Sequence, residues 1–224
     1  MRAFETEKTE VAEIDRSVYD IKDKVNAAFE VSSGLTAEIV EQISKEKHDP
    51  DWMREFRLKA LDIYNKASIP NWGPSLEGLD MRNIVTYVRP NTEMRGKWSE
   101  VPDDIKNTFE RLGIPQAERS SLAGVGAQYD SEVVYHNVKE EVAAQGVVYT
   151  DMESALTGPY ADMVKGHFMK CVPPTDHKFA ALHGAVWSGG SFVYVPAGVH
   201  VDIPLQSYFR LNAPGAGQFE HTLI

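Results

Sequence analysis

Short apolar runs alternate with clusters of turn-forming residues over the last part of the chain, residues 178–224. Clusters rich in serine, glycine, proline and asparagine separate these runs, which cover residues 180–187, 192–195, 199–203, 208–211 and 218–224. Short strands separated by turn residues at this spacing predict a layered β-structure. The last run ends on the apolar residues Leu223 and Ile224, with no polar tail. We therefore expect the strand ladder to continue in a longer protein, of which this sequence would be a fragment.

The composition is that of an ordinary globular protein of one large or two modest domains, with 224 residues, 42% hydrophobic and 25% charged. A net charge of −10 argues against binding to nucleic acid or to an anionic membrane surface. The sequence shows neither an apolar run long enough to span a bilayer nor a secretory signal. A single cysteine, Cys171, cannot form an internal disulfide. We expect a cytoplasmic protein.

Charged residues become less frequent after about residue 150, where we place a domain boundary. Residues 151–224 contain only 4 of the 23 basic and 6 of the 33 acidic side chains. We expect a polar arm over residues 1–35, a mainly helical domain over residues 36–150 and a β-rich unit over residues 151–224. The predicted fold class is α+β.

Helix signals are clearest in the first half of the chain. Thr36 is a candidate N-cap for a short helix, and a second helix is predicted to start at Asp49 and Pro50, with Asp49 accepting free amide hydrogens. A third is predicted from Pro102 to Gly113. Further helices are expected at 138–145 and within 151–169, and further strands at 84–88, 133–135 and 147–149.

Histidines and the cysteine are the candidate ligand residues. On a helix His167 and Cys171 would share a face, although a partly buried thiol near a helix end is the commoner interpretation. His200 and Asp202 would share one side of a strand, most simply its solvent face. His177 and His183 lie in the same apolar region without a spacing that selects a metal.

No catalytic motif stands out. Residues 124–126, Gly-Val-Gly, lack the remaining residues of a dinucleotide fingerprint or P-loop, and we predict a plain loop there. The sequence has neither a Gly-x-Ser-x-Gly elbow nor a His-Glu-x-x-His motif. We assign no catalytic, cofactor-binding or metal-binding residue and expect no enzyme.

Several long runs stand out in the sequence. The longest reads Ala-Val-Trp-Ser-Gly-Gly-Ser-Phe-Val-Tyr-Val-Pro at 185–196, and others occur, in order, at 49–58, 109–115, 141–149, 178–182, 203–210 and 217–220. Taken together, these runs resemble the SufB/SufD family of iron–sulfur cluster assembly scaffolds. The resemblance implies a helical N-terminal domain that leads into a right-handed parallel β-helix, here truncated, and then a C-terminal helical domain. It implies assembly with SufD and the SufC ATPase, and sulfur delivery by a cysteine desulfurase with its carrier protein.

The resemblance implies that the residues which hold the family's iron–sulfur cluster lie outside this segment. It implies an iron–sulfur cluster for the full-length family member, held by side chains in later parts of the sequence, and no cluster on this segment. The cysteine-rich motif of some members has no counterpart around residues 87–101, and no role transfers to Cys171.

A cupin-like barrel is the alternative reading. In that case His183, His200 and Asp202 would be the ligands of a metal-binding enzyme or small-molecule binding protein, although the paired His-x-His of such sites is missing.

Overall fold

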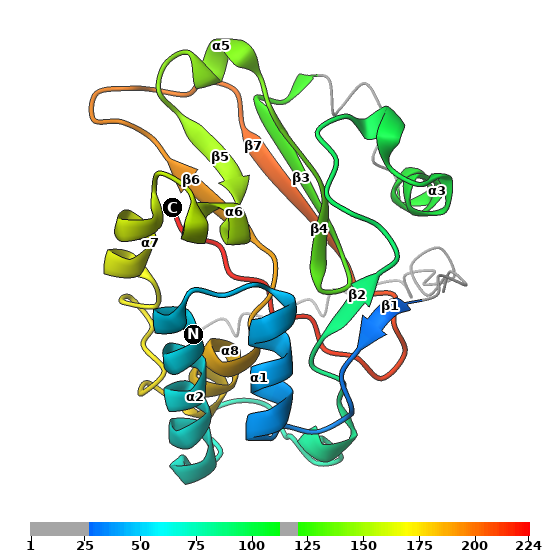
Figure 1. Cartoon of the computed structure of the whole chain (residues 1–224), viewed down its shortest axis with the longest axis vertical. Helices are drawn as coiled ribbons and strands as arrows, with labels where there is room; N and C mark the ends of the chain where they lie inside the picture. Colours follow the sequence, from blue (N-terminus) through cyan, green and yellow to red (C-terminus); the bar gives the residue numbers. More distant parts are fainter. Residues whose placement is uncertain (1–26, 113–120) are drawn as a thin grey trace, which may run out of the picture.

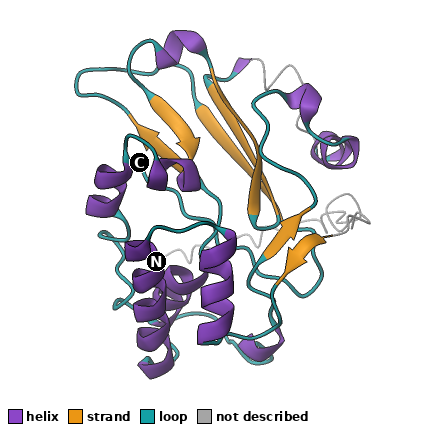
Figure 2. Cartoon of the chain, viewed as in Figure 1, coloured by secondary structure: helices purple, strands orange, loops and turns teal. Residues whose placement is uncertain are grey.

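The computed structural model describes residues 27–112 and 121–224, in which helices surround three small sheets (Figures 1 and 2). Most of the arm expected over residues 1–35 therefore lies outside the described residues, as does Gly113. Strand β1 (Ala27–Glu30) pairs antiparallel with β2 (Val88–Pro90). Within the described ranges, every helix is too short or too polar to cross a lipid bilayer.

Helices α1 (Ala37–Glu46), α2 (Asp51–Lys66) and α8 (Lys178–Val186) pack together below the sheets in Figure 1. The first two confirm the prediction from periodicity. Thr36 caps α1 as expected, since its hydroxyl accepts a hydrogen bond from the Ile39 amide at 3.3 Å. This bond satisfies one of the amide groups that the first turn of a helix leaves without a partner.

The predicted role of Asp49 was wrong. Pro50 stands at the N-cap position of α2, and no side chain caps this helix. The Asp49 carboxylate instead accepts from Arg57 Nε at 2.6 Å, and both side chains are fully buried. A buried guanidinium needs a counter-charge more than an exposed helix start needs a cap.

Helix α8 occupies residues that we predicted to be strand, so that prediction was also wrong. Its buried residues cover most sides of the helix, so the run shows no clear helical periodicity: Ala180, Ala181, Leu182, Gly184, Ala185 and Val186. A Cβ on Gly184 would come within 3.1 Å of the Ala60 Cβ. Glycine therefore allows α2 and α8 to approach closely.

The central sheet contains β4 (Glu132–Val138), β3 (Gly124–Tyr129) and β7 (Leu205–Arg210), in that order. β3 pairs antiparallel with β4 and parallel with β7. The strands expected around 133–135 and 208–211 are confirmed. β3, in contrast, includes the Gly-Val-Gly run that we predicted to be a loop.

The two glycines of β3 leave room for a neighbouring side chain and do not form a turn. A Cβ on Gly124 would lie 2.6 Å from Tyr149 Cδ1, and one on Gly126 would lie 3.0 Å from the Tyr149 hydroxyl. The phenol of Tyr149 thus crosses the face of the sheet where these two side chains are absent. Its hydroxyl donates to the carbonyl of Gln206 in β7 at 2.9 Å.

A two-stranded ribbon, β5 (Val148–Asp151) with β6 (Ser191–Tyr194), confirms the strands predicted near 147–149 and 192–195. Other predicted strands are reduced to single bridges. Val85 pairs with Ala216, and Leu223 pairs with Phe192, both in parallel orientation. Residues 199–203 form no strand.

The remaining helices whose bounds lie within the described residues are short (Figure 1). They are α3 (Asp103–Arg111), α5 (Glu140–Ala143), α6 (Met152–Thr157), α7 (Ala161–His167) and the 3-10 turns η1 (Met81–Asn83) and η2 (Trp98–Glu100). α3 and α5 confirm the predictions, and the helix expected within 151–169 is divided into α6 and α7.

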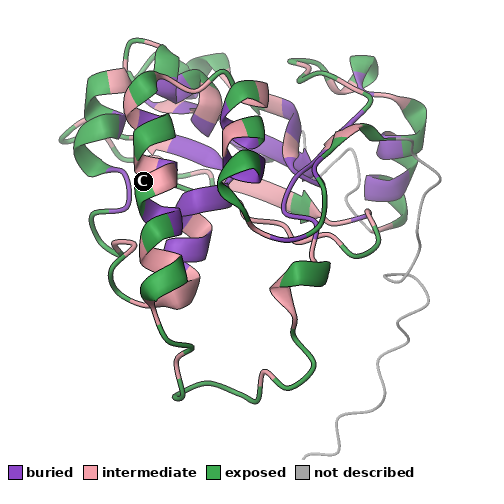
Figure 3. Cartoon of the chain, turned by 60° about the horizontal axis from the view of Figure 1, so that its bottom comes forward, coloured by how far each residue is buried: buried purple, intermediate pink, exposed green. Residues whose placement is uncertain are grey.

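Residue 150 falls inside β5, and strands on both sides of it share sheets. Residues 36–150 contribute strands β2 to β5 in addition to helices. Buried residues line the strands and the inner sides of the helices (Figure 3), and one apolar cluster joins α1, α2 and β2 to α8. The division of the chain into domains stays a prediction.

Candidate functional site

Four residues selected from sequence lie around one open cavity of about 640 Å³. His167, Cys171, His177 and His183 line it together with His221, which the sequence analysis did not select. The rest of the lining comes from the loop after α7, the start of α8 and residues 220–224. We term this cavity the histidine pocket.

The end of α7 separates the first two candidates. α7 stops at His167, Phe168 has an extended ψ of 121°, and Met169 has a φ of +48°. His167 and Cys171 therefore share no helical face. His167 Nδ1 lies 2.9 Å from the Met163 carbonyl oxygen, and the Cys171 thiol is free and exposed rather than partly buried.

His177 has a structural task as the N-cap residue of α8. Its Nδ1 accepts the backbone amides of Phe179 at 3.1 Å and Ala180 at 3.2 Å. That nitrogen lone pair serves the helix start and leaves only Nε2 for any ligand.

His183 and His221 form a hydrogen-bonded pair, with His183 Nε2 at 2.9 Å from His221 Nδ1. Burial lowers the pKa of His183 to about 4, and the Arg57 charge adds to this shift. Burial lowers the pKa of His221 to about 3, with His183 contributing. Both imidazoles are therefore neutral at pH 7, so that one donates and the other accepts.

A metal centre does not emerge from these side chains. Across residues 27–112 and 121–224, His, Cys, Asp and Glu form no group of three or more that could hold a metal ion. His200 and Asp202 pair with each other at 3.1 Å, each 87% exposed, in a loop that does not border the histidine pocket. The solvated interpretation of this pair is confirmed, but its placement on a strand was wrong.

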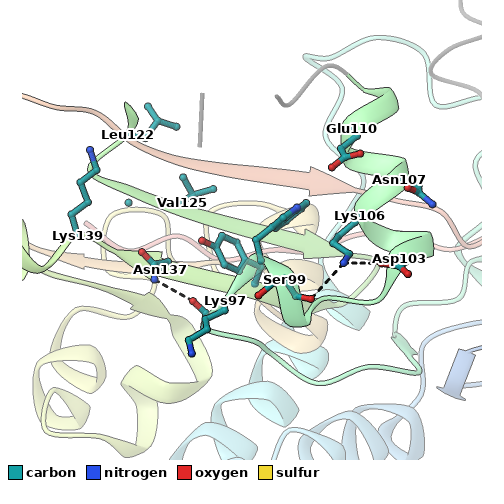
Figure 4. Close-up of a pocket in the computed structure, with 14 residues that line it drawn as sticks. Lys97, Ser99, Asp103, Lys106, Asn107, Glu110, Leu122, Val125, Asn137 and Lys139 are labelled. Atoms are coloured by element: carbon teal, nitrogen blue, oxygen red, sulfur yellow. Dashed lines mark hydrogen bonds and ion pairs between the residues drawn. The ribbon is translucent and has the colours of Figure 1, made fainter. Parts of the chain in front are cut away.

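A second cavity, of about 780 Å³, lies between α3 and the β3–β4 face of the central sheet (Figure 4). Lys97, Lys106 and Lys139 line it, with Asn107 and Asn137 beside them. We term it the α3 pocket. No local sequence pattern marks this pocket, because its walls come from three separate parts of the chain, within residues 96–110, 122–125 and 135–139.

A buried ion cluster joins α1 to two distant elements. Lys47 Nζ lies 2.8 Å from Glu132 of β4 and 2.7 Å from Glu153 of α6, and its side chain is only 4% exposed. The Tyr87 hydroxyl donates to Glu132. The sequence analysis did not select this cluster, since Glu132 lies 85 residues from Lys47 in the chain and Glu153 lies farther still.

Electrostatics keep this cluster charged. Burial alone would lower the pKa of Lys47, but the carboxylates of Glu153 and Glu132 outweigh it and raise the pKa. Burial would likewise raise the pKa of Glu153, and the Lys47 ammonium outweighs it and lowers the pKa. Burial raises the pKa of Tyr87, and the Glu132 charge raises it further. The cluster therefore acts as a charged crosslink between α1, β4 and α6.

Comparison with known proteins places this architecture in a family. The family model described as the SufBD protein N-terminal region matches residues 37–207. The iron–sulfur cluster assembly protein SufB of Bacillus subtilis is 53% identical over 206 residues, which cover 92% of this chain and 44% of that protein. An iron–sulfur cluster assembly SufBD family protein of Mycobacterium tuberculosis is 48% identical over 220 residues, 98% of this chain and 26% of that protein.

A SufBD family protein of Staphylococcus haemolyticus is 50% identical over 206 residues, again 44% of its length. This chain thus spans less than half the length of these relatives, and the match lies in the region that the family model describes as N-terminal. The chain belongs to the SufBD family.

Proposed function

We propose that this chain works as the N-terminal part of an iron–sulfur cluster assembly scaffold. The observation that carries the proposal is the 53% identity, over 92% of the chain, to a protein named for this process. At this level of identity the fold and the general role are shared. We propose a positioning role without enzymatic activity, in the cytoplasm.

We further propose that the central sheet begins a right-handed parallel β-helix. The parallel pairing of β3 with β7 and the parallel bridge between Phe192 and Leu223 support this. In a parallel β-helix each coil pairs with the next, so that a strand at the edge of the sheet receives its neighbour from later in the chain. β7 is such an edge strand within the described sheet.

The cluster, in this proposal, is cargo held by other parts of the scaffold. Iron–sulfur clusters are commonly held by four cysteine thiolates, whereas this chain has one cysteine. SufD, the SufC ATPase and a cysteine desulfurase with its sulfur carrier are the partners that we propose for the whole scaffold. The cupin-like alternative gains no support, since His200 and Asp202 do not line the pocket that contains His183.

A chimera tests this role. Residues 37–207 of this chain would replace the matching region of Bacillus subtilis SufB in cells depleted of the native protein. We expect the chimera to restore growth and the activity of an iron–sulfur enzyme such as aconitase. Tagged SufC should also co-purify the chimera together with SufD.

The same chimera with Cys171→Ser serves as the matched variant. Because the Cys171 thiol is exposed and lacks a grouped set of ligands, we expect this variant to restore enzyme activity equally well. A chimera that accumulates as a folded, soluble protein and yet restores no activity would refute the proposal. A selective defect of the serine variant would show that the thiol takes part in assembly.

A further inference from the structure

Three lysines and two carboxylates line the α3 pocket, so that its rim has an excess of positive charge in a chain whose net charge is −10: Lys97, Lys106 and Lys139 against Asp103 and Glu110. Lys139 Nζ donates to the uncharged carbonyl oxygen of Ser121 at 3.2 Å. Lys97 Nζ lies 3.9 Å from a Glu100 carboxylate oxygen, and the Lys97 side chain is 79% exposed. Neither contact neutralises its ammonium group as a close salt bridge would.

The third lysine of the pocket, Lys106, does form a close salt bridge. Lys106 Nζ lies 2.7 Å from Asp103, and the hydrogen bond from Lys106 lowers the pKa of Asp103. Figure 4 shows Lys106 and Lys139 on opposite sides of the pocket, with Val125 between them. The positive charges are thus spread around the rim rather than gathered at one point.

The floor of the pocket is apolar and aromatic. Trp98 packs edge-on against Tyr135, with ring centroids 5.2 Å apart, and against Phe109 at 5.9 Å. Val125 is almost fully buried beneath the cavity. A ligand that fits this surface needs apolar groups for the floor and separate negative charges for the rim.

We propose that the α3 pocket binds an acidic, partly apolar segment of a partner protein. A compact anion such as phosphate fits less well, since Lys106 and Lys139 lie on opposite sides of the pocket and one small ion cannot contact both. Nucleic acid is disfavoured by the net charge of the whole chain. An extended peptide reaches the separate lysines with alternate carboxylates and covers the aromatic floor with the residues between them.

The test uses the full chain and a short acetylated peptide of alternating glutamate and leucine, with binding measured by calorimetry. We expect saturable binding that weakens as salt rises from about 0.05 to about 0.3 M, because screening shortens the reach of rim charges. The same peptide with glutamine in place of glutamate should bind at least about fivefold more weakly. Inorganic phosphate and a thymidine oligonucleotide should show no saturable binding.

Charge-matched variants locate the binding. Lys97→Gln combined with Lys139→Gln should weaken the acidic peptide about five- to tenfold, as two exposed ion pairs would. Lys45→Gln combined with Lys59→Gln removes the same charge from exposed positions on α1 and α2 and should change affinity less than about twofold. Both double variants should melt at the temperature of the unmodified protein.

Equal weakening by both double variants would overturn the proposal, because it would show attraction to overall charge. So would equal binding of the glutamine peptide, or tighter binding of phosphate or the oligonucleotide. Absence of binding by the unmodified chain at low salt would overturn it as well. These results do not depend on the iron–sulfur role, which the chimera tests separately.

Discussion

At the scale of single residues, the chain places charges where water cannot reach them. Asp49 and Arg57 are both fully buried, and Arg57 Nη1 also donates to the Trp187 carbonyl oxygen at 2.8 Å. The Arg57 guanidinium lies 4.7 Å from the centre of the Trp187 ring. A single side chain of α2 thereby fixes the point where the chain leaves α8.

Removing the counter-charge should be costly. Asp49→Asn leaves the Arg57 guanidinium buried without a negative partner, and we expect the free energy of unfolding to fall by about 3–5 kcal/mol. Urea unfolding followed by circular dichroism measures it. Glu41→Gln breaks the solvent-exposed pair with Arg54, in which the Arg54 side chain is 48% and the Glu41 side chain 41% exposed, and should leave the free energy of unfolding almost unchanged. Similar losses in the two variants would show that Asp49 and Arg57 are effectively solvated.

Alanine substitutions at two glycines with positive φ distinguish the cost of backbone strain from the cost of a steric clash. Gly190 has a φ of +92°, and a Cβ there would lie 2.1 Å from the His221 carbonyl oxygen. Gly198 has a φ of +81° with nothing within 4 Å of its Cβ position. We expect Gly198→Ala to lower the free energy of unfolding by about 1–2 kcal/mol, the strain of a left-handed residue.

Gly190→Ala adds the clash and should cost about 2–5 kcal/mol in the same urea titration. A Gly190→Ala variant as stable as Gly198→Ala would mean that the segment containing His221 moves aside freely. That result would contradict the close packing of residues 189–190 against 221.

At the scale of elements, amphipathic helices were predictable and the buried one was not. α1 and α2 each bury one side and expose the other, so their periodicity was visible in sequence. α8 is buried on most sides, and a short apolar run reads equally well as strand or helix. β3 was missed for a related reason, since Gly124 and Gly126 are typical of loops until the ring of Tyr149 is placed over them.

The start of α1 gives an element-scale prediction. Thr36→Ala removes the side-chain oxygen that accepts the Ile39 amide, and should lower the free energy of unfolding by about 1 kcal/mol. Thr36→Ser retains that oxygen and should cost only a few tenths of that amount. Thermal melts of the two variants provide the comparison. If the serine variant loses as much stability as the alanine variant, the methyl group of Thr36 stabilises this turn and the capping hydrogen bond does not.

At the scale of the whole molecule, both pockets and the ion cluster arise from segments distant in sequence. His183 meets His221, 38 residues later, and Lys47 meets Glu132, 85 residues later. No local pattern marks such partners, because their pairing depends on how α1, α8 and the sheets are placed. Sequence could select His167, His177 and His183 as residue types, but not the cavity that they share.

Stability of the molecule should depend on pH through three histidines. Burial lowers the pKa of His183 to about 4, of His221 to about 3 and of His136 to about 4, from an ordinary value of 6.5. Below pH 6.5 the unfolded chain therefore binds protons at these histidines that the folded chain does not bind. The stabilisation that the neutral histidines contribute to the folded protein is complete above pH 6.5, and it is lost as the pH falls toward the pKa values of the folded state.

Urea unfolding at pH values between about 7 and 5 isolates this effect, because carboxylates hardly titrate there. Each histidine should lower the free energy of unfolding by up to about 1.4 kcal/mol per pH unit below its unfolded pKa. His183→Asn combined with His221→Gln should remove the larger part of the slope and leave that of His136. His200→Asn, at a side chain 87% exposed, should leave the slope unchanged. A pH slope as large in the double variant as in the unmodified protein would show that the histidine pair is already protonated in the folded protein, and its mutual hydrogen bond would then have to be replaced by contacts with water.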